Sequence, residues 1–177
     1  MKILLTAATV LFALVAAQVS AEEEIDAEKG FEDWAAFRDG GDCWIATFFE
    51  HKKADEVFTT YYFITFHDRS PQPRISIIPS SNYKTELILP LSVGGVTYEL
   101  EMFEGAAFPM DEDKEMSIFR KMLGSEPVSF TLRDVDGDSR KLDVSYSGFR
   151  DAYNYLSRSC EFDYTPRLSD IEGVEPT

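Results

Sequence analysis

The sequence predicts a mainly β domain, an antiparallel β-sandwich or open barrel of about seven short strands with one inserted helix and one C-terminal helix. Runs of β-branched and aromatic residues are separated by turn residues along most of the chain. Gly94-Gly95 and Asp136-Gly137 are dipeptides of the kind that close β-hairpins. Apolar residues recur at helical spacing in two stretches, 111–123 and 147–160.

Residues 1–21 have the pattern of a secretory signal peptide. Lys2 precedes an apolar run over residues 3–17, and small residues follow up to Ala21. A membrane anchor is the alternative, but the run is shorter than the roughly 18 to 20 apolar residues of a spanning helix. Acidic residues also follow directly from Glu22. We therefore expect export, cleavage after Ala21 and a mature protein that does not span the membrane.

The mature chain is predicted to hold one domain over residues 31–160. Residues 22–30 are predicted to be a flexible acidic leader, and residues 161–177 an acidic, disordered tail. The formal net charge of −15 at pH 7 repels phosphate backbones and anionic lipids, so nucleic-acid binding is not expected. The same charge keeps the protein soluble. We expect a monomer or a weak oligomer.

The first half of the domain is predicted to hold two strands. Residues 31–37 could form a helical turn or a strand, and residues 43–49 form a strand that is apolar on both faces. Residues 51–56 are predicted to be a charged loop, and residues 57–66 an aromatic strand. An aromatic strand can be a ligand platform, although packing in a core is the commoner role. The residues that we keep as a candidate ligand or partner surface are Tyr61, Tyr62, Phe63 and Phe66.

The second half is predicted to hold a short strand, two hairpins and a helix. The strand covers residues 74–78, and the first hairpin pairs 84–93 with 96–103; Pro90 there indicates an edge strand or a bulge. Asp111 is a suitable N-cap for a helix that ends at Leu123. The last hairpin pairs residues 126–133 with 139–146. Its turn contains Asp134, Asp136 and Asp138, but their spacing is not that of a calcium-binding loop, and a hairpin explains them.

Cys43 and Cys160 are the two cysteines of the chain. In an exported protein they indicate one disulfide, which would hold the C-terminal helix on the β core. Such a bridge closes a loop of more than 100 residues. The loop-closure entropy that it removes from the unfolded chain would stabilise the folded state by about 4.7 kcal/mol. A catalytic thiol and an intermolecular bridge are the alternatives.

The sequence indicates no catalytic residues, no metal ligands and no cofactor, so we expect a protein that is not an enzyme. It contains no nucleophile-elbow, phosphate-loop or paired-cysteine motif. His51 follows Glu50, and His67 precedes Asp68. Neighbours on an extended segment point to opposite sides and rarely act as an acid–base pair. A hydrolase that uses His51 or His67 is therefore the last of our three hypotheses.

Several short motifs occur in the order and spacing of a known group: Trp34 and Phe37 before Cys43-Trp44, then Gly94-Gly95, Phe108-Pro109, Gly124 to Val128, and Ser147-Gly148-Phe149 with Ala152 and Cys160. Over residues 31–160 the chain resembles the bacterial invasion-associated locus B family. The resemblance implies export to the periplasm or envelope, or secretion, and an all-β sandwich without established catalytic residues. It also implies that Cys43 pairs with Cys160. By the same resemblance, Trp34, Trp44 and Phe149 would be core markers.

The leading functional hypothesis is a periplasmic, non-enzymatic interaction or envelope module whose partner is an unidentified envelope or host protein. The second hypothesis is a periplasmic carrier that holds a small apolar molecule inside the sandwich. Its ligand would lie among Tyr61, Tyr62, Phe63 and Phe66.

Overall fold

The structure is a computed structural model that describes residues 29–53, 55–67, 70–81, 83–84 and 86–162. The predicted signal peptide, most of the leader and most of the tail lie outside the described residues. Lys29 and Gly30, at the end of the predicted leader, belong to the first strand. Phe162, two residues into the predicted tail, is buried against the core.

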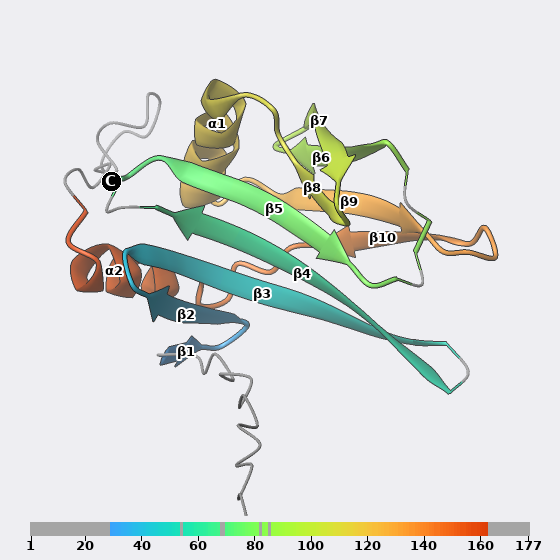
Figure 1. Ribbon diagram of the computed structural model, residues 1–177, viewed down its shortest axis with the longest axis horizontal. Coiled ribbons are helices and arrows are strands. Elements are labelled where there is room, and N and C mark those ends of the chain that lie inside the picture. Colours follow the sequence, from blue (N-terminus) through green and yellow to red (C-terminus); the bar gives the residue numbers. More distant parts are fainter. Residues whose placement is uncertain (1–28, 54, 68–69, 82, 85, 163–177) are drawn as a thin grey trace, which may run out of the picture.

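The described residues form ten strands and two helices. The strands form one antiparallel sheet in the order β1-β2-β3-β4-β5-β8-β7-β6-β9-β10 (Figure 1). The elements are β1 (Lys29–Phe31), β2 (Trp34–Asp39), β3 (Asp42–Lys53), β4 (Glu56–Phe66), β5 (Pro73–Pro79), β6 (Ile88–Val93), β7 (Val96–Phe103), β8 (Ala106–Phe108), α1 (Glu112–Leu123), β9 (Val128–Arg133), β10 (Ser139–Asp143) and α2 (Phe149–Ser159).

The predicted mainly β fold with two helices is confirmed, whereas the two-sheet sandwich and the count of about seven strands are not. The sheet curls until β3 and β9, which are far apart in strand order, meet through Phe49 and Phe130 with ring centroids 5.7 Å apart. It does not close, because β1 and β10 remain as edge strands. One curled sheet thus encloses the core that two stacked sheets would share.

Both helices begin and end close to where their residue patterns place them. The side chain of Asp111 accepts a hydrogen bond of 2.9 Å from the N–H of Asp113 and so caps α1. Gly148 precedes α2 with φ of 81°, and a Cβ there would collide with the carbonyl oxygen of Phe31. In Figure 1, α1 lies beside β5, and α2 lies beside β2 and the start of β3. Among the described residues, no helix combines the length and the apolar character that crossing a bilayer requires.

The core is built around aromatic rings on the inner face of the sheet. Trp34 of β2 lies 5.0 Å from Phe149 of α2 and 6.2 Å from Tyr62 of β4, measured between ring centroids. Its indole N–H donates a 2.8 Å hydrogen bond to the carbonyl of Ser145. Trp34 and Phe149 are thus buried, as the family resemblance implies, whereas Trp44 lies half-buried on the outer face.

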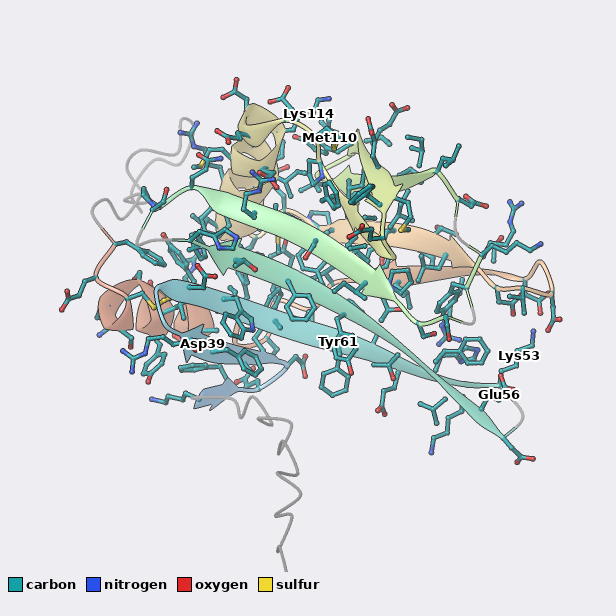
Figure 2. The ribbon with its side chains drawn as sticks, in the orientation of Figure 1. Asp39, Lys53, Glu56, Tyr61, Met110 and Lys114 are labelled. Carbon is teal, nitrogen blue, oxygen red and sulfur yellow. A yellow bond between two sulfur atoms is a disulfide. The ribbon has the colours of Figure 1, made fainter. Side chains whose placement is uncertain are left out.

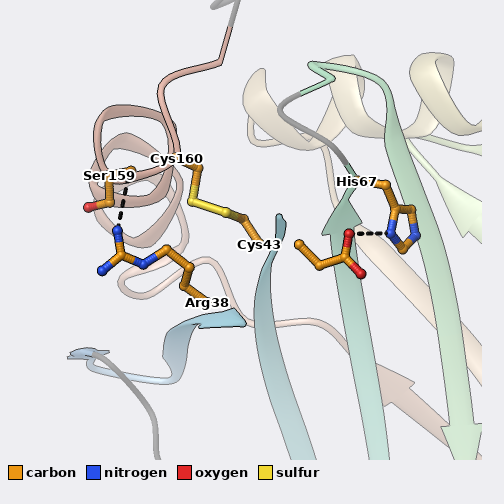
Figure 3. Close-up of a disulfide and its surroundings, with 6 residues drawn as sticks. Arg38, Cys43, His67, Ser159 and Cys160 are labelled. Carbon is orange, nitrogen blue, oxygen red and sulfur yellow. Dashed lines mark hydrogen bonds and ion pairs between the residues drawn. A yellow bond between two sulfur atoms is a disulfide. The ribbon is translucent and has the colours of Figure 1, made fainter. Parts of the chain in front are cut away.

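The predicted disulfide is confirmed: Cys43 at the start of β3 is bonded to Cys160 directly after α2 (Figure 3). Both cysteines are buried. Beside the bridge, Arg38 donates a 3.3 Å hydrogen bond to the carbonyl of Ser159. Covalent and polar contacts therefore attach the end of α2 to β2 and β3.

Both predicted hairpins are present, but β6 is an interior strand of the sheet and not the edge strand that Pro90 suggested. Gly94 and Gly95 connect β6 to β7 with φ of 57° and 79°, the backbone of a two-residue hairpin turn. β6 is an interior strand, but β9 pairs only with its residues from Leu91 to Val93, so the missing N–H of Pro90 interrupts no bond to β9.

The predicted charged loop at residues 51–56 is wrong, because β3 continues to Lys53 and β4 begins at Glu56. His51 pairs with Phe58 and Lys53 with Glu56 in the register of this hairpin. Tertiary contacts stabilise the charged end: the Nζ of Lys53 lies 2.7 Å from Asp134 in the turn after β9.

Candidate binding surface

The outer face of β2 to β5 carries large apolar side chains that neither helix covers. Side chains alternate along a strand, so Cys43, Ile45 and Phe49 of β3 point to the core while Trp44 and Phe48 point outward. The exposed fractions of Phe48, Tyr61 and Ile78 are 58%, 43% and 39%. Figure 2 shows Tyr61 projecting from the middle of this face.

The strand register arranges these side chains in three rows across the sheet. Residues two apart on a strand are about 7 Å apart, which is the spacing between adjacent rows. The middle row has mostly small side chains, and the rows on either side are bulky. The Trp44 row is Phe37, Trp44, Thr65 and Arg74; the small-residue row is Gly30, Ala35, Ala46, Phe63 and Ser76; the Tyr61 row is Phe48, Tyr61 and Ile78.

The difference in side-chain size produces an open trough of about 810 Å³, which we call the aromatic trough. Gly30, Ala35 and Ala46 line it between bulky walls. In the first wall, Phe37 and Trp44 stack with centroids 5.5 Å apart and planes 4° from parallel. The trough therefore offers flat aromatic faces to an apolar group from outside.

Tyr61 also contacts its neighbours within the trough. Its ring centroid lies 6.4 Å from that of Phe48 and 5.8 Å from that of Phe63. These contacts fix the ring of Tyr61 beside Phe48 of the same wall and Phe63 of the small-residue row, so an incoming group meets a preformed surface.

The charged residues that line the trough are all acidic: Glu32, Asp33 and Asp42. Arg74, at the β5 end of the Trp44 row, does not line the trough and forms an ion pair with Glu115. Asp33 accepts a 2.6 Å hydrogen bond from the hydroxyl of Ser145, and Glu32 accepts one from the hydroxyl of Ser147. Serine hydroxyls orient these carboxylates but do not neutralise them. Asp42 lies 2.8 Å from Nδ1 of His67. The trough therefore combines apolar walls with negative charge.

The four residues predicted as a ligand or partner surface are divided between the two faces of β4. Tyr61 and Phe63 line the aromatic trough. Tyr62 and Phe66 are fully buried. The hydroxyl of Tyr62 donates a 3.3 Å hydrogen bond to Sδ of Met122, and burial raises the pKa of this phenol well above its usual value. Tyr62 and Phe66 therefore belong to the core.

The other large side chains in the walls of the trough are Phe37, Trp44, Phe48 and Ile78. The sequence alone does not indicate these four as binding residues. Alternation in residues 43–49 already places Trp44 and Phe48 on one face. The sequence does not show that this face is the exposed one, because the opposite face of residues 43–49 is equally apolar.

Comparisons with protein-family models, with curated proteins and with solved structures found no match to this chain. The resemblance to the invasion-associated locus B family therefore stays a prediction.

The two histidines lie at opposite ends of the β3–β4 hairpin and do not come together. Nδ1 of His51 lies 2.7 Å from a guanidinium nitrogen of Arg140, whereas His67 contacts Asp42. The register places His51 opposite Phe58, near the turn of the hairpin. His67 directly follows Phe66, which pairs with Cys43 at the other end. His51 thus contacts a guanidinium group and His67 a carboxylate, and the two histidines share no site.

The three aspartates of the last turn surround a lysine. Nζ of Lys53 lies 2.7, 2.8 and 3.0 Å from Asp134, Asp136 and Asp138. The hydrogen bond that Lys53 donates to Asp134 is the main cause that lowers the pKa of this carboxyl. The hydrogen bonds that Lys53 donates to all three aspartates raise its own pKa. Among the described residues, no group of three or more His, Cys, Asp or Glu side chains is arranged to hold a metal ion.

Proposed function

We propose that this protein is an exported, non-enzymatic binding module of the periplasm and that the aromatic trough holds its partner, an envelope or host protein. The exposed rings of the Tyr61 row are the observation that supports this function. The solvent face of an antiparallel sheet is usually polar, and a large exposed apolar patch marks an interaction site.

Two further features support this function. The disulfide fits an oxidising compartment, because such bridges persist outside the reducing cytosol. The net charge of −15 opposes self-association, so the module acts as a monomer or weak oligomer that exposes the trough. Membership of the invasion-associated locus B family is part of the same proposal and would account for export and for an envelope setting.

Site-specific photo-crosslinking in intact cells tests this function. A photoreactive phenylalanine analogue replaces Phe48 in the trough, or Phe103 on β7, which is 61% exposed outside it. The expected result is a defined envelope-protein adduct from position 48 and none from position 103. Equal adducts from both positions, or none from position 48, would overturn the assignment of the trough.

A small-ligand carrier is the second candidate, and the size of the trough favours it. Ligand sites commonly have volumes of roughly 300–1,000 Å³, and the trough has about 810 Å³. The site would be the open trough, because Tyr62 and Phe66 are packed in the core. Native mass spectrometry of protein isolated from its own compartment should then show a retained small mass, which replacement of Tyr61 by Ser removes.

A further inference from the structure

Resting on the proposed binding role of the trough, we infer that its occupant is a basic polypeptide segment in which apolar side chains are flanked by Lys or Arg. The walls require apolar groups on the partner, and the charged lining residues require cations. Cations also interact favourably with the faces of aromatic rings such as those of Phe37 and Trp44.

The acidic residues lie next to both walls of the trough. Asp42 is two residues from Trp44 on β3, so the two point to the same side of the sheet. Glu32 and Asp33 immediately precede β2, whose Ala35 pairs with Ala46 between the walls. A segment lying in the trough can therefore place apolar side chains against the walls and basic ones beside carboxylates on either side.

Charge argues against other occupants from this protein. Residues 22–28 contain five acidic and no basic side chains, and residues 163–177 contain four acidic side chains and Arg167. A second copy carries the same net charge of −15. Each would bring negative charge to a trough that already has three carboxylates.

A fluorescein-labelled hexapeptide that alternates Lys with Phe, added to the disulfide-bonded protein, tests the inference by fluorescence anisotropy. We expect it to bind at least about tenfold more tightly than the same peptide with Glu in place of Lys. Binding should weaken as ionic strength rises from about 0.02 M to about 0.3 M, because Glu32 and Asp33 are exposed to solvent and the side chain of Asp42 is 48% exposed.

Matched variants separate charge from apolar contact. Asp33→Asn and Asp42→Asn should each weaken binding of the basic peptide roughly two- to fivefold, and Tyr61→Ser should weaken it roughly tenfold or more. The controls Glu99→Gln and Phe103→Ser, at exposed positions of β7, should leave binding unchanged. Thermal melting of each variant identifies any loss of folding, and Glu32→Gln replaces Asp42→Asn if the latter unfolds.

Equal binding of the acidic and basic peptides would overturn the inference, as would unchanged affinity in the charge variants. So would tight binding of a neutral glucan hexasaccharide without binding of the basic peptide, because aromatic rings also stack on sugars. A trough-specific crosslink at position 48 to a partner without basic segments would overturn the inference and leave the proposed function intact.

Discussion

The backbone N–H of Ile75 in β5 donates a 3.1 Å hydrogen bond to Oε1 of Glu115 in α1. On this side β5 pairs with β8 only at Ile77, so a glutamate supplies the acceptor that a neighbouring strand would offer. Arg74 forms an ion pair with the other oxygen of Glu115 at 3.3 Å. One buried carboxylate thus joins the inserted helix to the strand at the edge of the aromatic trough.

Replacement of Glu115 by Ala should lower the free energy of unfolding by about 1–3 kcal/mol, because the buried N–H of Ile75 loses its acceptor. Glu115→Gln keeps an acceptor oxygen and is the matched control, so most of the loss should be absent from it. Urea unfolding of the three proteins measures the difference. A Gln variant as unstable as the Ala variant would show that the charge, and not the acceptor, holds the helix.

The buried carboxyl of Glu115 also predicts that the stability of the protein depends on pH. Burial is the main cause that raises the pKa of Glu115 above its ordinary value of 4.5. A carboxyl whose pKa is raised on folding stabilises the protein below that ordinary value, and the contribution is lost as pH rises through the folded pKa. The parent should therefore lose stability relative to Glu115→Gln as pH rises from 4.5, which unfolding curves between about pH 4 and 8 can measure.

Loss of the disulfide should destabilise the domain strongly. Cys43 and Cys160 are 117 residues apart, and loop-closure entropy for a bridge of this length gives about 3–5 kcal/mol. Cys43→Ser combined with Cys160→Ser should lower the urea midpoint, and a reducing agent should have no further effect on this variant. A reduced parent protein with an unchanged midpoint would contradict this prediction.

The strands and helices could be predicted where local pattern decides the structure. Alternation and turn residues suffice for β4 and for the hairpin at Gly94, and capping by Asp111 suffices for α1. The charged end of β3 could not be predicted, because Lys53 is stabilised by Asp134, 81 residues away. The three-residue strands β1 and β8 are too short to carry a pattern.

The candidate site could be predicted only in part, for a related reason. Both faces of β3 are largely apolar, and their sequence does not say which face the helices cover. α2 decides this by packing Phe149 against Trp34 on the inner side, which leaves Trp44 and Phe48 outside. The candidate binding surface is thus a consequence of where a helix more than 100 residues downstream lies.

The lysine among three aspartates should stabilise the long hairpin at neutral pH. Lys53→Met removes the ion pairs to Asp134, Asp136 and Asp138 and leaves their charges to repel one another, so the urea midpoint should fall. Lys141→Met is the control, because its ion pair with Asp143 is largely exposed and contributes little. Equal effects of the two substitutions would contradict the role of Lys53.

This stabilisation should depend on pH in the opposite direction to that of Glu115. The pKa of Asp134 is lowered below its ordinary 3.8, mainly by the hydrogen bond from Lys53. Its contribution is present above 3.8 and is lost as pH falls through the folded value. The difference between the parent and Lys53→Met should therefore shrink in acid, and a difference that grows there would contradict the assignment.

Adjacent tyrosines on β4 provide the most direct test of the two faces. Tyr62 is fully buried and contacts Trp34 and Met122, so Tyr62→Ala should lower the free energy of unfolding by about 3–5 kcal/mol. Tyr61→Ala removes a side chain of the same type from the exposed trough and should lower the free energy of unfolding by less than about 1 kcal/mol. Urea unfolding followed by tryptophan fluorescence measures both. Similar losses of unfolding free energy in the two variants would mean that the trough is covered or that β4 is rotated. A much smaller loss for Tyr61→Ala would show that folding does not require the ring of Tyr61, which leaves this ring available for a partner.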